Sequence, residues 1–430
     1  MAVTRVRVFA LKIVMAALEE GRWANKLIVP YLFKLDDPRD QKLLTELVYG
    51  TIKMKLRLDW TISTYLKKHR IDDLTSPIRN VLRLGAYQLL YTRIPDYAVI
   101  SESVKLARKF GHRGVASLVN AVLRRIAGQR PSPSEPWILH SHPRWLYERW
   151  AELWGEERAI EMMRHNNSPA PIYLRVNTLA INVDSFVELL TEKGARFKRP
   201  DFPPECVMVE RAPQLIDLPE KLYYVQDRSS QMVAHLMAPE PGWTVYDLAA
   251  APGGKITHIA ALMRDTGRII AVELHSSRAN EMQKIIQRLG INSIDVVVGD
   301  GSQVTFDGPA DAVLTDVPCS GLGTLRRRPE LRWRMRPDRI PELVRIQRSI
   351  LENGARNLRV GGILVYSTCT VEPQENEIQI KNFLADHPNF RLEPAANYLP
   401  DGFTEGDFMF IDGAKHDCDY MFAARLRKVS

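Results

Sequence analysis

The sequence predicts a multidomain protein of the α and α/β class, because its hydrophobic pattern changes twice along 430 residues. Apolar residues first recur at spacings of three and four, as in amphipathic helices. A short mixed stretch follows, and from about residue 226 short apolar runs alternate with helical patterns, which is typical of a doubly wound α/β domain. We therefore predict three domains: an all-helical one over residues 1–130, a small α+β unit over 138–225, and a doubly wound domain over 226–430.

The N-terminal domain combines its helical pattern with an excess of positive charge. Residues 1–140 contain 24 Lys and Arg against 12 Asp and Glu, whereas the remainder contains 35 against 39. This bias favours a polyanionic partner, most simply nucleic acid. The alternative is a solvated helical surface that happens to be basic.

The first twenty residues predict an amphipathic helix rather than a secretory signal. Lys12 interrupts the apolar stretch, and Glu19 and Glu20 follow it without a small-residue cleavage site. No stretch approaches eighteen apolar residues, so we expect no membrane span. The four cysteines form no C-x-x-C pair, which argues against a disulfide framework or a structural zinc site. We expect a cytoplasmic monomer without a metal.

The α+β unit follows a linker rich in proline and serine, AGQRPSPSEPW (127–137). Within the unit, PIYLRVNT (171–178) alternates in polarity and predicts a strand, and VDSFVELLTEKG (183–194) predicts a helix closed by its glycine.

The C-terminal domain is predicted to contain six short strands. They are TVYDLA (244–249), RIIAVEL (268–274), SIDVVVGD (293–300), DAVLTDV (311–317), GGILVYST (361–368) and DYMFAARL (419–426). Their apolar runs are nearly continuous, as in a buried and mostly parallel sheet. The carboxyl ends of such strands meet at one crevice, where ligands bind.

The first strand leads into DLAAAPGGKITHIA (247–260), a glycine-containing loop that opens a helix. Gly253 and Gly254 let the backbone approach a ligand closely, but their spacing matches neither the dinucleotide fingerprint nor a phosphate loop. The second strand ends in Glu273, which can accept ribose hydroxyls, and the third ends at Asp300, which can accept an adenine amino group. One loop and two strand-end acids favour S-adenosylmethionine over NAD; the alternative is that the acids only cap strands or helices.

The fourth and fifth strands each lead to a cysteine. DVPCSGLGT (316–324) contains Cys319, and STCT contains Cys369. In a doubly wound sheet both thiols, with Asp316, face the same crevice. A thiolate added at C6 of a pyrimidine makes C5 reactive towards a methyl donor, an acid at N3 stabilises the adduct, and a base removes the C5 proton. The alternatives are burial as small apolar residues, or a metal pair, for which further ligands at suitable spacing are missing.

The segment after the fourth strand, LRRRPELRWRMRP (325–337), is rich in arginine. Its cations and aromatic residue are Arg326, Arg327, Arg328, Arg332, Trp333, Arg334 and Arg336. Guanidinium groups suit phosphates, and an indole can stack on an unpaired base. We expect this segment to clamp an RNA backbone, against the alternative of a solvated surface helix.

These motifs, in this order, resemble those of the RNA cytosine-C5 methyltransferases of the Nop2/Sun family. The matching stretches are AAAPGGK, AVELHSSR, DVPCSGLGT with RRRPELRW, and YSTCTVEPQENE, with VQDRSSQMVAHLM before them and CDYMFAARLRK after them. RVNTLAINVDSF resembles the small RNA-recognition-like unit of the family. LRLGAYQLLYTRIPDYAVISESVKLARKFG and LVNAVLRRI resemble the helical NusB family. This domain order is that of the bacterial Sun/Fmu branch, so the resemblance implies a Rossmann-like catalytic domain and 16S ribosomal RNA as substrate.

The resemblance also assigns roles to individual residues. It implies a cofactor loop of Ala249, Ala250, Ala251, Pro252, Gly253, Gly254 and Lys255, with Glu273 at the ribose, Asp300 near the adenine and Asp316 between the target base and the cofactor. It implies that Cys369 is the nucleophile and that Cys319 helps to release the product. Ala249 stands where relatives often have cysteine, and Glu273 where many have aspartate.

Without the resemblance, the two cysteines could not be ranked. The local sequence gives modest support for Cys369, because Glu372-Pro373 is typical of a helix start, and a helix N-terminus close to Cys369 would favour its thiolate. Other functions stay open: the same chemistry on tRNA, or a non-catalytic RNA-binding assembly factor. Amino-group methylation is disfavoured, because that chemistry uses a P-P-Y/F-type motif rather than D-V-P-C.

Overall fold

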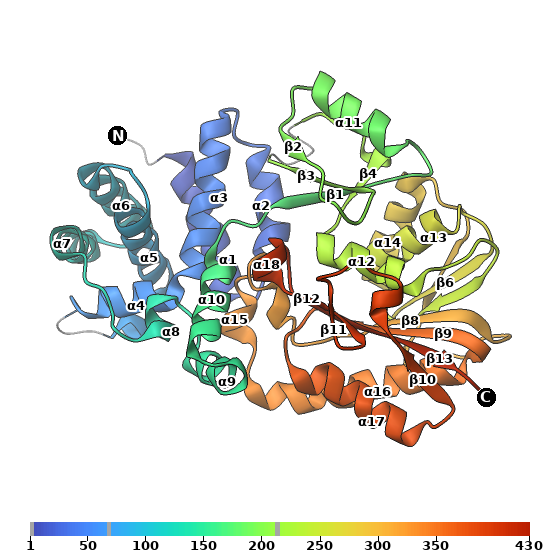
Figure 1. Ribbon diagram of the computed structural model, residues 1–430. Helices are drawn as coiled ribbons and strands as arrows, with labels where there is room; N and C mark the ends of the chain where they lie inside the picture. Colours follow the sequence, from blue (N-terminus) through green and yellow to red (C-terminus); the bar gives the residue numbers. More distant parts are fainter. Residues whose placement is uncertain (1–3, 67–69, 211–215) are drawn as a thin grey trace. The chain divides into compact units, whose positions relative to one another are not determined.

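A computed structural model describes residues 4–66, 70–210 and 216–430 (Figure 1). Residues 1–3, 67–69 and 211–215, which fall within the predicted helical domain and α+β unit, lie outside the described residues. The chain forms two compact units: unit 1 contains residues 1–168 and 325–335, and unit 2 contains residues 169–324 and 336–430. Among the described residues, no helix is both long and apolar enough to cross a membrane.

Unit 1 is helical, as predicted. Its main helices are α1 (Arg5–Glu19), α2 (Ala24–Leu32), α3 (Pro38–Lys53), α4 (Lys55–Ser63), α5 (Ser76–Tyr91), α6 (Asp96–Phe110), α7 (Arg113–Gln129), α8 (Pro136–Leu139), α9 (Arg144–Trp154) and α10 (Glu156–Asn167). The start of α3 is set by its local sequence. The side chain of Asp37 caps the helix by accepting a hydrogen bond from Arg39 N, and Pro38 occupies the first turn. Helix α5 is buried on nearly every side and contributes to a core shared by α1 to α7. Helices α9 and α10 belong to unit 1. The sequence had instead predicted them to be part of the α+β unit over residues 138–225.

The arginine-rich segment belongs to unit 1. This inserted segment, residues 325–335, contains the short helix α15 (Leu331–Arg334). Trp333 donates its indole N–H to Ile52 O at 2.8 Å, and Glu330 accepts from Ala24 N at 2.8 Å. Arg332 is completely buried and donates to Asn167 Oδ1 at 2.8 Å and to Ser141 O at 3.2 Å. The inserted segment is therefore part of the core of the helical unit.

This placement corrects the expected arginine clamp. Arg332 and Arg326 are buried, so neither of these side chains lies open to RNA in this structure, and Trp333 is half-buried against the helical core. Burial, together with the charges of Arg332 and Arg326, lowers the pKa of Lys53 to about 7. Arg328 is exposed and Arg327 is half-buried; an RNA contact by these two residues stays a prediction.

Unit 2 begins with a small antiparallel sheet of order β2-β3-β1-β4. Its strands are β1 (Ile172–Val176), β2 (Phe197–Lys198), β3 (Cys206–Val209) and β4 (Tyr223–Val225), and α11 (Val183–Glu192) packs on it through Phe186 and Leu190. Asn182 caps α11 by accepting from Ser185 N. The strand and helix predicted for this part of the chain are thus present.

The large sheet of unit 2 has nine strands, eight of them in the order β11-β12-β13-β9-β8-β5-β6-β7, with β10 paired to β13. They are β5 (Thr244–Asp247), β6 (Arg268–Glu273), β7 (Ile294–Val298), β8 (Ala310–Asp316), β9 (Leu358–Thr368), β10 (Phe390–Glu393), β11 (Thr404–Glu405), β12 (Phe408–Ile411) and β13 (Met421–Lys428). The strands from β7 to β9 are parallel, and β10 to β13 add an antiparallel edge. All six predicted strands are present, and β10 to β12 were not predicted.

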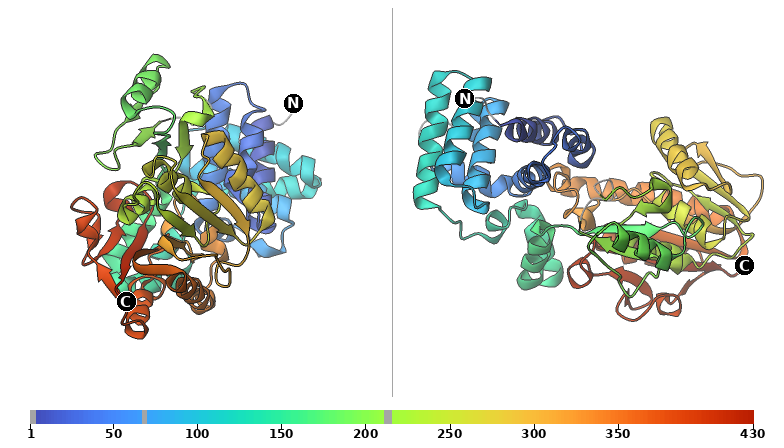
Figure 2. Two further views of the ribbon diagram at one scale, coloured as in Figure 1. Left: turned by 90° about the vertical axis from the view of Figure 1, so that its right-hand side faces the viewer. Right: turned by 90° about the horizontal axis from the view of Figure 1, so that it is seen from above.

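Helices cover both faces of this sheet (Figures 1 and 2). On one face lie α12 (Arg228–Met237), α13 (Gly254–Leu262) and α14 (Ser276–Leu289); on the other lie α16 (Ile340–Arg356) and α17 (Glu377–Asp386). Alternate residues of β8 point to opposite faces of the sheet and so pack into two different hydrophobic cores. Ala312 and Leu314 pack towards the first face, and Val313 packs towards the second. The doubly wound fold class predicted from the sequence is confirmed, with a mixed rather than purely parallel sheet.

Candidate active site

The two predicted thiols meet at the carboxyl ends of β8 and β9. These strands are parallel and pair Asp316 with Ser367, so Cys319 and Cys369 follow at the same edge of the sheet. Their Sγ atoms are 3.4 Å apart, and both side chains are partly exposed. The structure thus brings together two residues that are 50 positions apart in the sequence.

The environment of Cys319 keeps it protonated. The hydrogen bond to Cys369, burial, and the charges of Cys369 and Glu375 all raise the pKa of the Cys319 thiol well above its ordinary value. A neutral Cys319 can donate its S–H to a thiolate at Cys369. The pair therefore provides one potential nucleophile and one proton-carrying partner.

Asp316 and Lys255 form an ion pair beside the thiols. Lys255 Nζ lies 2.8 Å from Asp316 Oδ2, and Ser367 Oγ donates to Asp316 Oδ1 at 2.7 Å. Burial lowers the pKa of Lys255, but the negative charge of Asp316 and, more weakly, that of Cys369 outweigh it, so that the pKa is raised. Lys255 is therefore a cation that can stabilise a thiolate at Cys369.

A glycine fixes the backbone at Cys369. Gly323 N donates to Cys369 O at 3.0 Å, and Gly323 O accepts from Tyr420 N at 3.1 Å. A Cβ at position 323 would lie 2.6 Å from Tyr420 O and 2.8 Å from Cys369 O. Only glycine fits between the two segments without moving them.

A buried carboxylate that the sequence did not single out lies beneath the thiols. Glu375 Oε1 accepts from Ser320 N and from Gln347 Nε2, both at 2.8 Å. Tyr366 OH donates to Glu375 O at 2.6 Å. Burial raises the pKa of Glu375 against the opposing effect of the hydrogen bonds from Ser320 and Gln347. Glu375 therefore joins the loop that carries Cys319 to the one that follows Cys369.

The expected helix start after Cys369 differs from the structure. Pro373–Glu375 forms a single 3₁₀ turn, η6, and α17 begins at Glu377. Thr368 Oγ1 donates to Asn376 Oδ1 at 2.5 Å, and Asn376 Nδ2 donates to Thr370 O at 3.1 Å. These side-chain bonds tie the segment to the strand end in place of a regular helix. The positive group near Cys369 is Lys255 rather than a helix N-terminus.

The predicted cofactor loop follows β5 and faces the ends of β6 and β7. Ala250 N donates to Val272 O at 2.9 Å, Gly253 has a φ of 99°, and α13 begins at Gly254. The Glu273 carboxylate is buried and accepts from His275 N at 2.9 Å. Asp300 is exposed and accepts from Ser302 N at 2.9 Å. The loop and both acids thus lie where the sequence predicted them, at successive strand ends.

Asp247, at the end of β5, is a further site residue. Its Oδ1 accepts from Ala249 N at 3.2 Å, but its buried Oδ2 has no hydrogen-bond partner in the described part of the chain. Burial and the charge of Asp316 raise the pKa of Asp247 to about 8. An unpartnered buried carboxylate oxygen is costly unless a ligand completes it. Asp247 could have been recognised as a site residue from the sequence, because it ends the strand that precedes the one ended by Glu273.

Two exposed apolar side chains lie at the strand ends on the cofactor side of the site. Leu274 follows β6 and Val298 ends β7, and both are more than half exposed. The register pairs Glu273 with Val298, so the two apolar residues lie at neighbouring strand ends. A flat aromatic base is the kind of group that such side chains bind. Together with the unpartnered Asp247 oxygen, they fit a cofactor with an ammonium group at one end and an adenine at the other.

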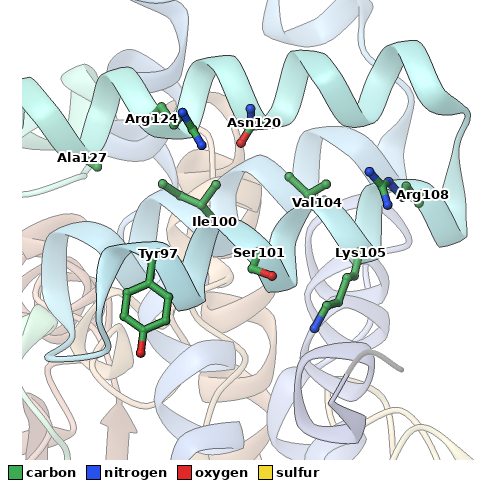
Figure 3. A pocket seen from close by; sticks show the side chains of 9 residues that line it. All are labelled: Tyr97, Ile100, Ser101, Val104, Lys105, Arg108, Asn120, Arg124 and Ala127. Atoms are coloured by element: carbon green, nitrogen blue, oxygen red, sulfur yellow. The ribbon is translucent and has the colours of Figure 1, made fainter. Parts of the chain in front are cut away.

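Unit 1 offers a separate basic groove between α6 and α7 (Figure 3). Lys105 and Arg108 of α6 and Arg124 of α7 supply its cations, and Ile100 and Val104 lie between the two helices. Tyr97, at the start of α6, is 78% exposed. A row of cations beside an exposed aromatic ring suits an RNA backbone with an unpaired base.

Comparisons with known proteins match each part of the chain to a family. Residues 234–427 match the family described as 16S rRNA methyltransferase RsmB/F, residues 4–128 match the NusB family, and residues 142–215 match the ferredoxin-like domain of RsmF/B-like methyltransferases. Over 412 residues the chain is 36% identical to the probable ribosomal RNA small subunit methyltransferase B of Synechocystis sp., covering 91% of this chain and 92% of that one. The chain belongs to the RsmB/F family.

Solved structures share the fold of this chain. The crystal structure of PH0851 is similar with a TM-score of 0.84 and 27% identity, covering 99% of this chain and 100% of that one. NSun6 from Pyrococcus horikoshii with SFG is similar with a TM-score of 0.62 and 25% identity, covering 68% of this chain and 100% of that one. Membership of the RsmB/F family makes this chain an S-adenosylmethionine-dependent rRNA methyltransferase and confirms the family resemblance seen in the sequence.

The contact at Gly323 gives a testable prediction. Gly323→Ala is expected to lower the free energy of unfolding of unit 2 by about 1–3 kcal/mol, because the added methyl must displace backbone. It should also reduce methyl transfer by about a hundredfold, because Cys369 moves with that backbone. Urea denaturation and a methyl-transfer assay measure the two effects. Gly308→Ala is the control, since a Cβ there meets nothing within 4 Å; equal behaviour of the two variants would contradict the prediction.

Proposed function

We propose that this chain methylates C5 of a specific cytosine in 16S rRNA, with S-adenosylmethionine as the methyl donor. The observation that carries the proposal is the thiol pair, 3.4 Å apart, beside the Lys255–Asp316 ion pair. Methylation of an exocyclic amino group needs no thiol, whereas methylation at C5 needs a nucleophile at C6. The family relationship supplies the RNA class of the substrate.

The residues take the following parts in the proposed reaction. Cys369, as the thiolate stabilised by Lys255, adds to C6 of the cytosine and makes C5 nucleophilic. Asp316 and Lys255 provide a hydrogen-bond acceptor and donor for the polar edge of the ring and stabilise the adduct. Bound S-adenosylmethionine supplies an electrophilic methyl group, which C5 takes.

Cys319 is proposed to complete the turnover. Once Cys369 is bonded to carbon, its negative charge is gone, and with it one cause of the raised pKa of Cys319. Cys319 can then release its proton to solvent and take the proton from C5. The electrons of that C–H bond restore the C5–C6 double bond, and the Cys369–C6 bond breaks to regenerate the thiolate.

For the cofactor, we propose that Asp247 binds the ammonium group of the methionine part. Glu273 would accept the ribose hydroxyls, and Asp300 would lie near the adenine. Ala249 to Lys255 would enclose the cofactor through backbone groups, and Leu274 and Val298 would contact the adenine faces. The related structure that contains SFG, an analogue of the methyl donor, supports a cofactor of this class.

The thiol assignment is tested by exchanging each cysteine. Cys369→Ala is expected to abolish methyl transfer, whereas Cys319→Ala should accumulate a covalent protein–RNA adduct because the product is not released. The assays are incorporation of labelled methyl groups into rRNA and denaturing gels, with 5-fluorocytosine RNA as a trap for the wild-type adduct. Cys206→Ala, a buried thiol in β3, is the control. An active Cys369→Ala variant would reverse the assignment.

The pKa of Asp247 predicts how cofactor binding depends on pH. The group is largely neutral at pH 6 and ionised above its pKa of about 8, and an ammonium ligand binds the ionised form. Affinity for S-adenosylmethionine should therefore rise between pH 6 and 8, by up to about tenfold per pH unit. Isothermal titration calorimetry measures it. Asp247→Asn should bind weakly with a flat profile, and Asp295→Asn, an exposed residue of β7, should retain the wild-type slope; a steep profile in Asp247→Asn would refute the role.

The groove between α6 and α7 is proposed to bind the rRNA backbone. Arg124→Glu or Arg108→Glu should weaken rRNA binding and make the salt dependence shallower by about one counterion per lost phosphate contact. Filter binding at several salt concentrations gives both quantities. Arg391→Glu, on the exposed side of β10, is the charge-matched control. Arg328→Glu tests the exposed member of the expected clamp in the same assay, and unchanged slopes in the groove variants would exclude the groove.

A further inference from the structure

Three side chains of metal-ligand type converge at a point in unit 2 that the proposed chemistry does not use. Glu205 directly precedes β3, His235 lies on α12 and His258 lies on α13. Glu205 Oε1 is 2.8 Å from His235 Nε2 and 2.5 Å from His258 Nε2. Their ligand atoms all lie within 4.8 Å of one another. Two imidazole nitrogens and one carboxylate oxygen thus face a common centre.

Hydrogen bonds satisfy His258 only in part. The residue is 1% exposed, and within the described residues its Nδ1 has no hydrogen-bond partner. Its Nε2 lies 2.5 Å from Glu205 Oε1 and interacts with that carboxylate. An unpartnered buried ring nitrogen is costly, and a nitrogen that faces a buried carboxylate at this distance is also the arrangement that a shared cation would use.

The charge balance of the cluster also favours a cation. Glu205 is buried, and its carboxylate is contacted by the imidazole groups of His235 and His258. Arg175 offsets part of the charge, but its N–H groups donate to Gln226 Oε1, Gly254 O and Thr257 Oγ1. A divalent ion between the three ligands would neutralise the carboxylate and bind both imidazoles at the same time.

We propose that Glu205, His235 and His258 form a zinc site. Two nitrogen donors and one oxygen donor match the preferences of Zn²⁺, and a water molecule can take the fourth tetrahedral position. That position is accessible beside His235, whose side chain is 17% exposed. Ligand atoms around tetrahedral zinc are about 3.3 Å apart, so Glu205 Oε1 would move away from each nitrogen by less than about 1 Å to admit the ion.

The zinc site has a structural role: it links two elements of unit 2 and takes no part in catalysis. Glu205 belongs to the small sheet, and His258 lies one turn after Gly254 and Lys255, which end the cofactor loop and open α13. Zinc would therefore join β3 to the helix that fixes this loop. The sequence argued against a metal because it contains no C-x-x-C pair, whereas these ligands are separated by 30 and 23 residues and meet only in the fold.

The test uses the 430-residue chain, stripped with EDTA and then dialysed against one molar equivalent of ZnCl₂. We expect one zinc ion per chain by atomic emission, a higher melting temperature than in the stripped protein, and visible absorption of tetrahedral type when Co²⁺ replaces zinc. His235→Ala and Glu205→Gln should each bind zinc at least about tenfold more weakly. His235 is the preferred position because it is partly exposed, which makes correct folding of the variant easy to verify by circular dichroism.

His112→Ala, an exposed histidine at the start of α7, controls for adventitious binding and should leave the stoichiometry and affinity unchanged. A wild-type protein that retains no zinc overturns the proposal, as does wild-type affinity in either His235→Ala or Glu205→Gln. None of these measurements depends on methyl transfer, so the outcome is independent of the proposed function.

Discussion

The parallel pairing of β8 with β9 is the constraint on which the candidate site depends. Backbone hydrogen bonds fix Asp316 opposite Ser367, and both chains then leave the sheet at the same edge. Each exit loop reaches a cysteine within three residues, so the register of one ladder sets the distance between the two sulfur atoms. The carboxylate of Glu375 below and the backbone of Gly323 at the side hold these loops in place. A shift of this ladder by one residue would turn Asp316 and its neighbours to the opposite face.

Asp316 shifts the pKa of two neighbouring groups in the candidate site. Its charge raises the pKa of Lys255, and so keeps a cation beside the thiols, and it also raises the pKa of Asp247 at the neighbouring strand end. One carboxylate thus influences both the side that faces the target base and the side that faces the cofactor. The effect is strong because Asp247 is buried and Lys255 and Asp316 are largely buried, so that water screens their charges poorly.

The sequence predicted features that depend on local pattern together with a general rule of α/β folds. Short apolar runs ended by Glu273, Asp300 and Asp316 identified the strand ends, and the rule that parallel strands end at one edge placed both thiols together. Features that depend on distant packing were missed. Arginine in the inserted segment looked exposed, yet Arg332 is buried and bonds to Ser141 and Asn167, which lie 191 and 165 residues earlier in the chain. Glu375 looked like part of a helix start, because only the folded loops reveal its partners.

Because the inserted segment comes late in the chain, the core of the helical unit can be completed only late in translation. Residues 4–168 contain ten α-helices in the described part of the chain, but the core that they form is closed by Trp333 and Glu330. During translation the helices leave the ribosome long before those residues exist. Until residue 335 has emerged, Ile52 O and Ala24 N lack their native partners, and the apolar surface that receives Trp333 stays open to water. The helical unit therefore reaches its native packing only after β5 to β8 have been synthesised, which couples the maturation of the two units within a growing chain.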